Sequence, residues 1–330
     1  MTSDTNLLPK FSSEKILTFF KAPLTIALIL IVLLLVVGEV LSPGFASADQ
    51  IMRLLIVAAL LGIVAAGQNL VILGGGGGID LSVGGIVSLS AVLAGNIMDG
   101  SNIHIPLAIL GCIMVGALIG LFNGIGIALL RIPPLVMTLG MLGVLQGLLI
   151  VIRNGIPSGR AATALSDFVV HPFIFGVSGI LWLWLLIGLL MAFLLQRTVL
   201  GSRIYAVGAN ETTAFMVGVP VKTIRIAVYI LCGVFASLAG VCLLGYSGSS
   251  FSNVGEQYML PSIIAVVLGG TPLSGGKGAY TGTMAGAVLL TVLQSILTTL
   301  NIDEAGRQVV FGMTLLILML FYGRGRAMRG

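Results

Sequence analysis

The sequence predicts an all-α polytopic membrane protein with about ten transmembrane helices. Of its 330 residues, 58% are hydrophobic and only 8% are charged, whereas soluble domains carry about 25% charged residues. Apolar segments of about 20 residues, the length that spans a bilayer, recur from Leu24 to Tyr322. These segments are rich in Leu, Ile, Val, Ala and Gly and show no alternation of polar and apolar residues, which argues against a lipid-exposed β-barrel.

Ten segments are apolar enough to form the predicted spans. They are residues 22–41, 51–73, 83–98, 105–130, 134–152, 179–196, 226–245, 258–270, 279–299 and 307–322. The eighth is short, which predicts a broken or tilted helix. An even number of spans places both termini on the same side, so 22–322 is one transmembrane domain between a tail of residues 1–21 and a basic tail of residues 323–330.

The first apolar segment also has features of a cleaved signal peptide. Basic residues precede it and Ala46-Ser47-Ala48 follows it, as at a signal-peptide cleavage site. However, the apolar run from Ala22 to Leu41 is longer than the core of a signal peptide, which has about 7–15 residues. We therefore expect a retained first span, and cleavage after Ala48 is the alternative.

The basic residues support this topology. Twelve of the sixteen Lys and Arg residues fall on the side of the termini and the remaining four on the other side. By the positive-inside rule, both termini are predicted to be cytoplasmic. The long loop 197–225 is then cytoplasmic and the long loop 153–178 lies outside. We attribute the net charge of +5 to membrane orientation and not to nucleic-acid binding.

Five consecutive glycines, Gly74 to Gly78, follow the second span and precede Asp80. A carboxylate at the centre of a membrane helix costs about 2.5–3.5 kcal/mol, so Asp80 is expected at an interface or in a protein-lined cavity. Glycines let the backbone leave helical geometry, and Asp80 and Ser82 are placed to cap the next helix. Two interpretations remain open, a well-capped turn or a hinge or gate. The gate would comprise Gly76, Gly77, Gly78, Asp80 and Ser82.

A short helix is predicted within the loop 197–225. Asn210 is a favourable N-cap, and Glu211 stands in the first turn, where the helix dipole favours an acid. Gly218 and Pro220 predict the end of this helix. A helix of about two turns does not persist alone in water, so it must pack on this protein or in the groove of a partner.

The segment Gly270–Gly278 resembles a phosphate-binding loop but lacks its pattern. Thr271 stands where the pattern needs Gly, and Gly278 follows Lys277 where it needs Ser or Thr. We interpret the segment as a turn between helices. The sequence has no recognisable Ser-His-Asp set, metal cluster or carboxylate pair, which argues against an enzyme and predicts no metal or cofactor bound by this chain.

Several polar residues lie inside the predicted spans. They are Gln68, Asn69, Asn123, Thr138, Gln146, Gln294 and Tyr229. Each is either an interhelical hydrogen-bonding group, worth about 0.6–2 kcal/mol, or part of a translocation path. Because no span carries a central carboxylate or Arg, the set as a whole favours an uncharged polar solute over an ion.

A series of motifs runs in order from about Gly67 to the C-terminus. They are Gly77–Gly84, Asn123-Gly124, Ile132–Gly140, Gly208–Glu211, Cys232–Gly240, Ala265–Gly270 and Gly275–Gly278. Together they make the sequence resemble the permease subunits of ribose-type ABC sugar importers, of the branched-chain amino acid/ribose permease superfamily. The family usually has a shorter segment before Gly-Ile-Asp-Leu-Ser, so the all-glycine run here is a departure.

The resemblance implies a type II importer-like permease in the bacterial inner membrane. Two permeases, either two copies or this chain with a related one, would form the pore. Separate cytoplasmic ATPase subunits would use ATP and Mg, and a periplasmic binding protein would deliver a sugar to the outer loops, including 153–178. The resemblance also places the ATPase-coupling loop here. Its residues are Gly208, Asn210, Glu211, Thr212, Thr213, Ala214 and Gly218.

An ion-coupled secondary transporter that acts alone is the alternative function. That class usually shows ionisable residues within the membrane and inverted repeats. Neither is clearly recognisable here. Leu73-Gly74-Gly75 echoes Leu268-Gly269-Gly270, but both follow spans of the same predicted direction, so the echo is not inverted.

Overall fold

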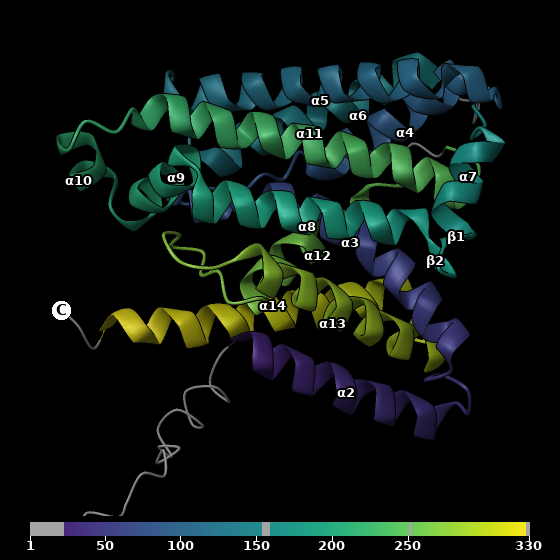
Figure 1. Cartoon of the computed structure of the whole chain (residues 1–330). Helices are drawn as coiled ribbons and strands as arrows, with labels where there is room; N and C mark the ends of the chain where they lie inside the picture. The colour runs from purple at the N-terminus through teal and green to yellow at the C-terminus, as the bar shows by residue number, and fades with distance from the viewer. Residues whose placement is uncertain (1–22, 154–158, 251–252, 328–330) are drawn as a thin grey trace, which may run out of the picture.

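The computed structural model describes residues 23–153, 159–250 and 253–327, and this part of the chain is a bundle of long helices (Figure 1). The predicted tail 1–21 lies outside the described residues. The long helices are α2 (Pro23–Leu41), α3 (Ala48–Leu73), α4 (Val83–Met98), α5 (Ile105–Ala128), α6 (Pro134–Arg153), α8 (Gly179–Arg197), α11 (Val221–Ser247), α12 (Glu256–Leu268), α13 (Tyr280–Thr299) and α14 (Glu304–Ala327).

Each predicted apolar segment overlaps one of these helices over most of its length. Among the described residues, seven helices are long and apolar enough to cross a membrane, and α4 and α12 are apolar but shorter. Helix α12 is the expected short segment, and Pro261 lies inside it. Because proline cannot donate the backbone hydrogen bond of a helix interior, it favours a kink at this position. The number of ten spans and the side of the termini remain predictions.

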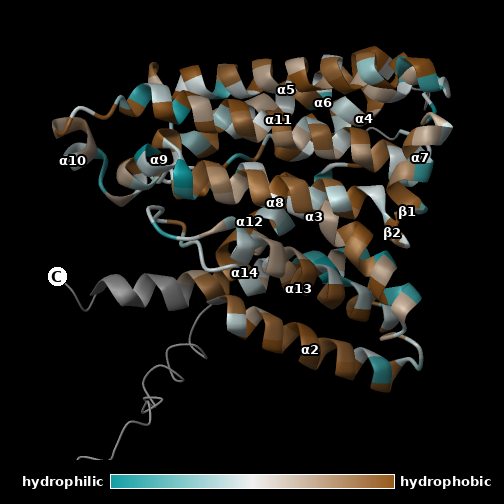
Figure 2. Ribbon diagram, in the orientation of Figure 1, coloured by the Kyte–Doolittle hydropathy of each residue, from teal (hydrophilic) through white to brown (hydrophobic). Residues whose placement is uncertain are grey.

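Helix α3 lies at the centre of the bundle. Its residues from Ala58 to Leu73 are all buried, and it packs against α11, α13, α12 and α8. Helix α2 lies at the periphery against α13. Hydrophobic residues cover the outward faces of the long helices as well as the contacts between them (Figure 2). Such outward apolar faces suit a hydrocarbon solvent.

Small residues bring α5 and α11 into backbone contact. Gly116, Gly120 and Gly124 follow one another at intervals of four residues, so they share one face of α5. An added Cβ at Gly124 would lie 2.8 Å from the Cα atom of Ile226, and one at Gly116 would overlap with the carbonyl oxygen of Gly233. This is the close packing that small residues permit between membrane helices.

Short elements mark the two ends of the bundle (Figure 1). Helices α9 (Val199–Ala209) and α10 (Glu211–Met216) lie at the end that the sequence predicts to be cytoplasmic, here named the α10 end. Helix α7 (Thr163–Val170) and an antiparallel hairpin of β1 (Pro172–Ile174) and β2 (Val177–Ser178) lie at the opposite end, named the α7 end.

Helices α9 and α7 and the hairpin were not predicted from the sequence, and α11 begins at Val221, five residues before the predicted start at 226. The signals for these elements are weak because they are short. For α9, the cap is Thr198, whose side chain accepts a hydrogen bond from the amide of Gly201 at 3.1 Å.

Candidate functional site

Three glycine-rich segments from distant parts of the chain meet at the α10 end. They are the turn Gly74–Gly78, Gly208 near the end of α9, and Gly275-Gly276 between α12 and α13. The amide of Gly276 donates to the carbonyl oxygen of Leu73 at 2.9 Å. We name these segments together the glycine junction. They are parts of both the predicted gate and the predicted coupling loop, so the structure joins two features that the sequence analysis treated separately.

The glycine junction has no room for a side chain at Gly75, Gly208 or Gly275. A Cβ added to Gly75 would lie 2.7 Å from the Cα atom of Gly208, and one added to Gly275 would lie 2.6 Å from the Cα atom of Gly75. A Cβ added to Gly208 would lie 2.6 Å from the nitrogen of Gly276 and would overlap with the carbonyl oxygen of Leu73. Backbones therefore touch directly at this point.

The run of glycines also has a conformational cause. The φ angles of Gly75, Gly76 and Gly77 are +71°, +65° and +70°, in the left-handed region that strains residues with a Cβ. These consecutive left-handed residues turn the chain sharply out of α3 and toward α4. The positive φ angles explain why glycine stands at Gly75, Gly76 and Gly77. The close approach to Gly208 is a second reason for glycine at Gly75.

The predicted short helix is present as α10. The side chain of Asn210 accepts a hydrogen bond from the amide of Thr213 at 2.9 Å, as expected of an N-cap. Glu211 stands in the first turn, and Gly218 follows the helix with a φ angle of +84°. Local capping chemistry therefore defines this helix, as the sequence indicated.

Helix α10 exposes its largest apolar side chains. Phe215, Met216 and Val217 are 72%, 78% and 73% exposed, whereas Ala214 is buried. Three adjacent apolar side chains at the tip of a bundle end form a surface that favours a protein partner. The helix therefore packs on its own chain through Ala214 and offers its other face outward.

An ion pair connects α10 to α11 and to the glycine junction. The guanidinium of Arg225 on α11 lies 2.8 Å from the Glu211 carboxylate. A Cβ added to Gly76 would lie 2.6 Å from the same guanidinium nitrogen. A movement of α10 would therefore displace both the start of α11 and the glycine turn. This ion pair was not predicted from the sequence, although both charges lie in one predicted loop.

Tyr205 provides a second connection on α9. Its hydroxyl donates to the carbonyl oxygen of Gly278 at 2.7 Å. Partial burial raises the pKa of the Tyr205 phenol above its ordinary value. The contact ties α9 to the chain beside Gly275 and Gly276. Sequence patterns gave no signal for it.

A hollow of about 840 Å³ opens beside α10. Its walls include Glu211 and Phe215 of α10, Arg131 from the turn after α5, and Lys222 and Arg225 of α11. The apolar wall and the excess of cations make it a receptive surface for a protein segment that carries both apolar and acidic groups.

Asp80 belongs to a buried network next to the glycine turn. The side chain is fully buried, and its Oδ1 atom accepts hydrogen bonds from the amide of Ser82 at 2.9 Å and from the Ser82 hydroxyl. Asn123 of α5 donates to the Ser82 hydroxyl oxygen at 2.9 Å. With its amide nitrogen toward the Asp80 carbonyl, Gln68 donates to that oxygen at 3.3 Å and accepts from the Asp80 amide at 3.2 Å. The network fixes the start of α4 against α3 and α5.

Replacing Asp80 with alanine is expected to destabilise the folded protein by about 1–3 kcal/mol, because the buried Ser82 donors lose their acceptor. Asp80→Asn is the matched control, since it keeps an oxygen acceptor at the same position. The measurement is the thermal unfolding temperature of both variants in detergent, with size-exclusion chromatography used to detect unfolding. Equal unfolding temperatures for Asp80→Ala and the wild type would contradict a structural role for this carboxyl.

The polar residues predicted for the path fall into two groups. Gln68, Asn69, Asn123 and Thr138 are fully buried and join helices; for example, the Asn69 amide donates to the hydroxyls of Thr271 and Thr283 at 3.2 and 3.0 Å. Tyr229 is also buried. By contrast, Gln146 and Gln294 line an open hollow at the α7 end.

Comparison with known proteins assigns the chain to a family. The profile of the family described as "Branched-chain amino acid transport system / permease component" matches residues 50–319. The ribose import permease protein RbsC of Escherichia coli (strain K12) is 34% identical over 299 residues, which cover 89% of this chain and 92% of that protein. The autoinducer 2 import system permease protein LsrC of Escherichia coli (strain SMS-3-5 / SECEC) is 35% identical over 300 residues, which cover 91% of this chain and 86% of that protein.

No solved structure matches the chain. The family match covers most of the chain, and the two relatives align with nearly its whole length. The chain therefore belongs to the family of branched-chain amino acid transport system permease components, and it is a membrane-spanning permease subunit of an ATP-binding-cassette importer in the bacterial inner membrane.

Proposed function

We propose that this permease translocates a sugar or a closely related polar solute, and that a separate ATPase subunit drives it by docking on α10. The observation that carries the proposal is the arrangement of α10, a capped helix with three exposed apolar side chains beside a basic hollow. The helix is connected by the Glu211–Arg225 pair to the glycine junction, from which α3 and α4 continue into the bundle.

The mechanism follows from these contacts. When the ATPase subunit binds and hydrolyses ATP with Mg, it moves α10, and Arg225 carries the displacement to α11. The glycine turn moves with the guanidinium that lies against Gly76. Because backbones meet without side chains at the glycine junction, small displacements there shift whole helices instead of being absorbed by side-chain rotation. This chain itself binds no nucleotide, and the ATPase chemistry belongs to its partner.

The substrate class rests on the relatives and on the polar residues. The two relatives are named for the import of ribose and of autoinducer 2. Apart from Asp80, the buried polar side chains of the described bundle are amides and hydroxyls, which agrees with an uncharged solute. The chain is also proposed to pair with a second permease, either another copy or a related chain, as its membership of the permease family implies.

Docking of the delivering protein is proposed at the α7 end. Helix α7 and the hairpin project there, and Phe175 at the hairpin turn is 91% exposed. This assignment makes the α7 end periplasmic and the α10 end cytoplasmic, in agreement with the distribution of basic residues. A binding protein that releases sugar at this end would deliver it to the hollow that Gln146 and Gln294 line.

Replacing Phe215 with aspartate is expected to reduce capture of the ATPase subunit by at least about tenfold, because it removes an apolar anchor worth more than about 1.4 kcal/mol. The test is affinity purification of the tagged permease expressed together with its ATPase subunit. Phe175→Asp is the matched control, the same change on an exposed phenylalanine at the other end. If Phe215→Asp captures as much ATPase subunit as the control Phe175→Asp, α10 is not the docking helix.

A further inference from the structure

A second hollow, of about 300 Å³, lies at the α7 end and is lined by polar side chains from four helices. Gln146 comes from α6, Glu256 and Gln257 from the start of α12, Gln294 from α13, and Glu304 and Gln308 from the start of α14. We name it the glutamine hollow. Four amides and two carboxylates meet there, although only Gln146 and Gln294 stood out in the sequence.

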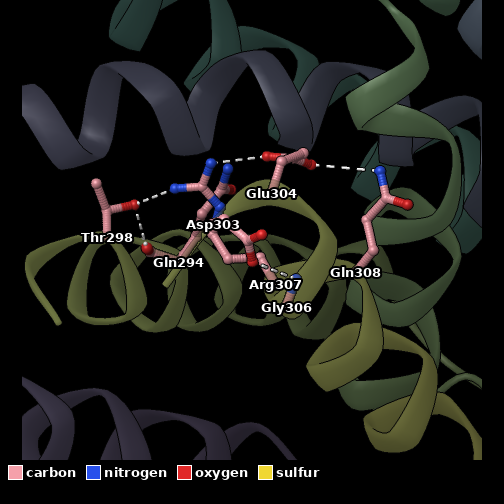
Figure 3. Close-up of polar contacts among 7 residues, drawn as sticks. All are labelled: Gln294, Thr298, Asp303, Glu304, Gly306, Arg307 and Gln308. Atoms are coloured by element: carbon pink, nitrogen blue, oxygen red, sulfur yellow. Dashed lines mark hydrogen bonds and ion pairs between the residues drawn. The ribbon is translucent and has the colours of Figure 1, made fainter. Parts of the chain in front are cut away.

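A cation compensates one of the two carboxylates of the glutamine hollow, and amides donate hydrogen bonds to both. Arg307 lies 2.8 Å from the Glu304 carboxylate and also donates to the Thr298 hydroxyl at 2.7 Å, as Figure 3 shows at the corner of α13 and α14. The amide of Gln308 donates to Glu304 at 3.4 Å. On the other side, the Gln146 amide donates to the Glu256 carboxylate at 3.2 Å.

These bonds leave unused hydrogen-bonding capacity. Each amide that donates one proton keeps a second proton and two acceptor positions on its oxygen. The side chain of Gln294 has no hydrogen bond to another residue in the part of the chain that the structure describes. The Thr298 hydroxyl donates to the backbone carbonyl oxygen of Gln294 and not to its side chain. The hollow therefore presents several donors and acceptors within a small volume.

Exposed apolar side chains flank lining residues along α6 and α14. They are Val144 and Leu148, on either side of Gln146, and Val309 and Met313, on either side of Phe311. Uncompensated amides facing hydrocarbon would cost several kcal/mol each (about 4–8 in the worst case). Water or a polar solute is therefore the favourable content of the hollow, and lipid is not.

We propose that the glutamine hollow binds an uncharged polyhydroxylated solute and is the first site that receives it on this chain. Amides can donate and accept to neighbouring hydroxyls, and carboxylates accept from them. Leu142 and Phe311, which also line the hollow, offer apolar contact to the C–H groups of a sugar ring. No Lys or Arg belongs to the described lining, which disfavours an anion. A volume near the lower limit of small-molecule pockets, about 300–1,000 Å³, suits one monosaccharide.

The inference rests on the proposed function, so the experiment reports on both. Cells express the complete transporter, and uptake of radiolabelled D-ribose and of autoinducer 2 is measured with Gln294→Leu, Gln308→Leu and the control Gln50→Leu. Gln50 is at the same end, on α3, and is bonded to Arg53 outside the hollow. At a subsaturating concentration of the probe, we expect uptake to fall about five- to tenfold in each hollow variant, which corresponds to the loss of about one hydrogen bond. We expect no fall in uptake for the control.

A second measurement separates binding from folding. The native cysteines Cys112, Cys232 and Cys242 are all buried, so a thiol introduced by Gln308→Cys is the accessible one for a membrane-impermeant reagent. The transported probe is expected to slow labelling of that thiol. Unchanged labelling together with uptake like that of Gln50→Leu would overturn the sugar site and leave the importer assignment standing. A wild-type transporter that accumulates neither probe would overturn the proposed substrate class and this inference with it.

Discussion

Replacing Gly208 with valine is expected to abolish transport and to lower the unfolding temperature. The new Cβ would overlap with the Leu73 carbonyl oxygen and lie 2.6 Å from the Gly276 nitrogen, so backbone and not flexible side chain must move. Overpacking of this kind costs about 1–3 kcal/mol, and the hydrogen bond from Gly276 to Leu73 would be lost in addition. Transport fails because α9 can no longer contact the glycine turn.

The measurement pairs sugar uptake with thermal unfolding in detergent. Gly111→Val is the matched control, because Gly111 lies on α5 and the nearest atom to an added Cβ there is 3.7 Å away. For Gly208→Ala we expect uptake and an unfolding temperature between those of the wild type and Gly208→Val, since alanine adds the clashing Cβ without the two further methyl groups of valine. Wild-type uptake by Gly208→Val would mean that the three glycine segments do not touch in the membrane.

Local chemistry made α10 and the long helices predictable from the sequence. Asn210, Glu211 and Gly218 act through atoms a few residues away, so their pattern contains the whole cause of the helix. The same is true of apolar segments, whose length and composition alone match a bilayer.

The contacts between distant segments were not predictable in the same way. The glycine junction joins residues near 75, 208 and 275, and each glycine run by itself fits an ordinary turn. The Leu-Gly-Gly pattern occurs at both Leu73 and Leu268, but this repetition does not predict which glycines contact one another. Likewise, Gln68 and Gln294 look alike in sequence, and only packing makes one a link between helices and leaves the other facing a hollow.

Reversing the charge of Glu211 with lysine is expected to reduce uptake at least about tenfold while the ATPase subunit continues to hydrolyse ATP. The Glu211 side chain is half exposed, so the ion pair with Arg225 adds only about 0–1 kcal/mol to stability. Its larger effect is on geometry, because it fixes α10 against α11 and Gly76. Transport and hydrolysis are measured together in proteoliposomes that contain the complete transporter.

The charge swap distinguishes the ion pair from each charge alone. Glu211→Lys combined with Arg225→Glu restores opposite charges between α10 and α11, and we expect uptake to recover most of the loss. Recovery stays incomplete because a lysine in the first turn of α10 opposes the helix dipole by about 0.3–1 kcal/mol. If the double variant is as inactive as Glu211→Lys, the carboxylate acts on the ATPase subunit directly. If Glu211→Lys transports normally, coupling does not pass through this pair, and the path to the membrane helices runs through the backbone contacts of Gly208 alone.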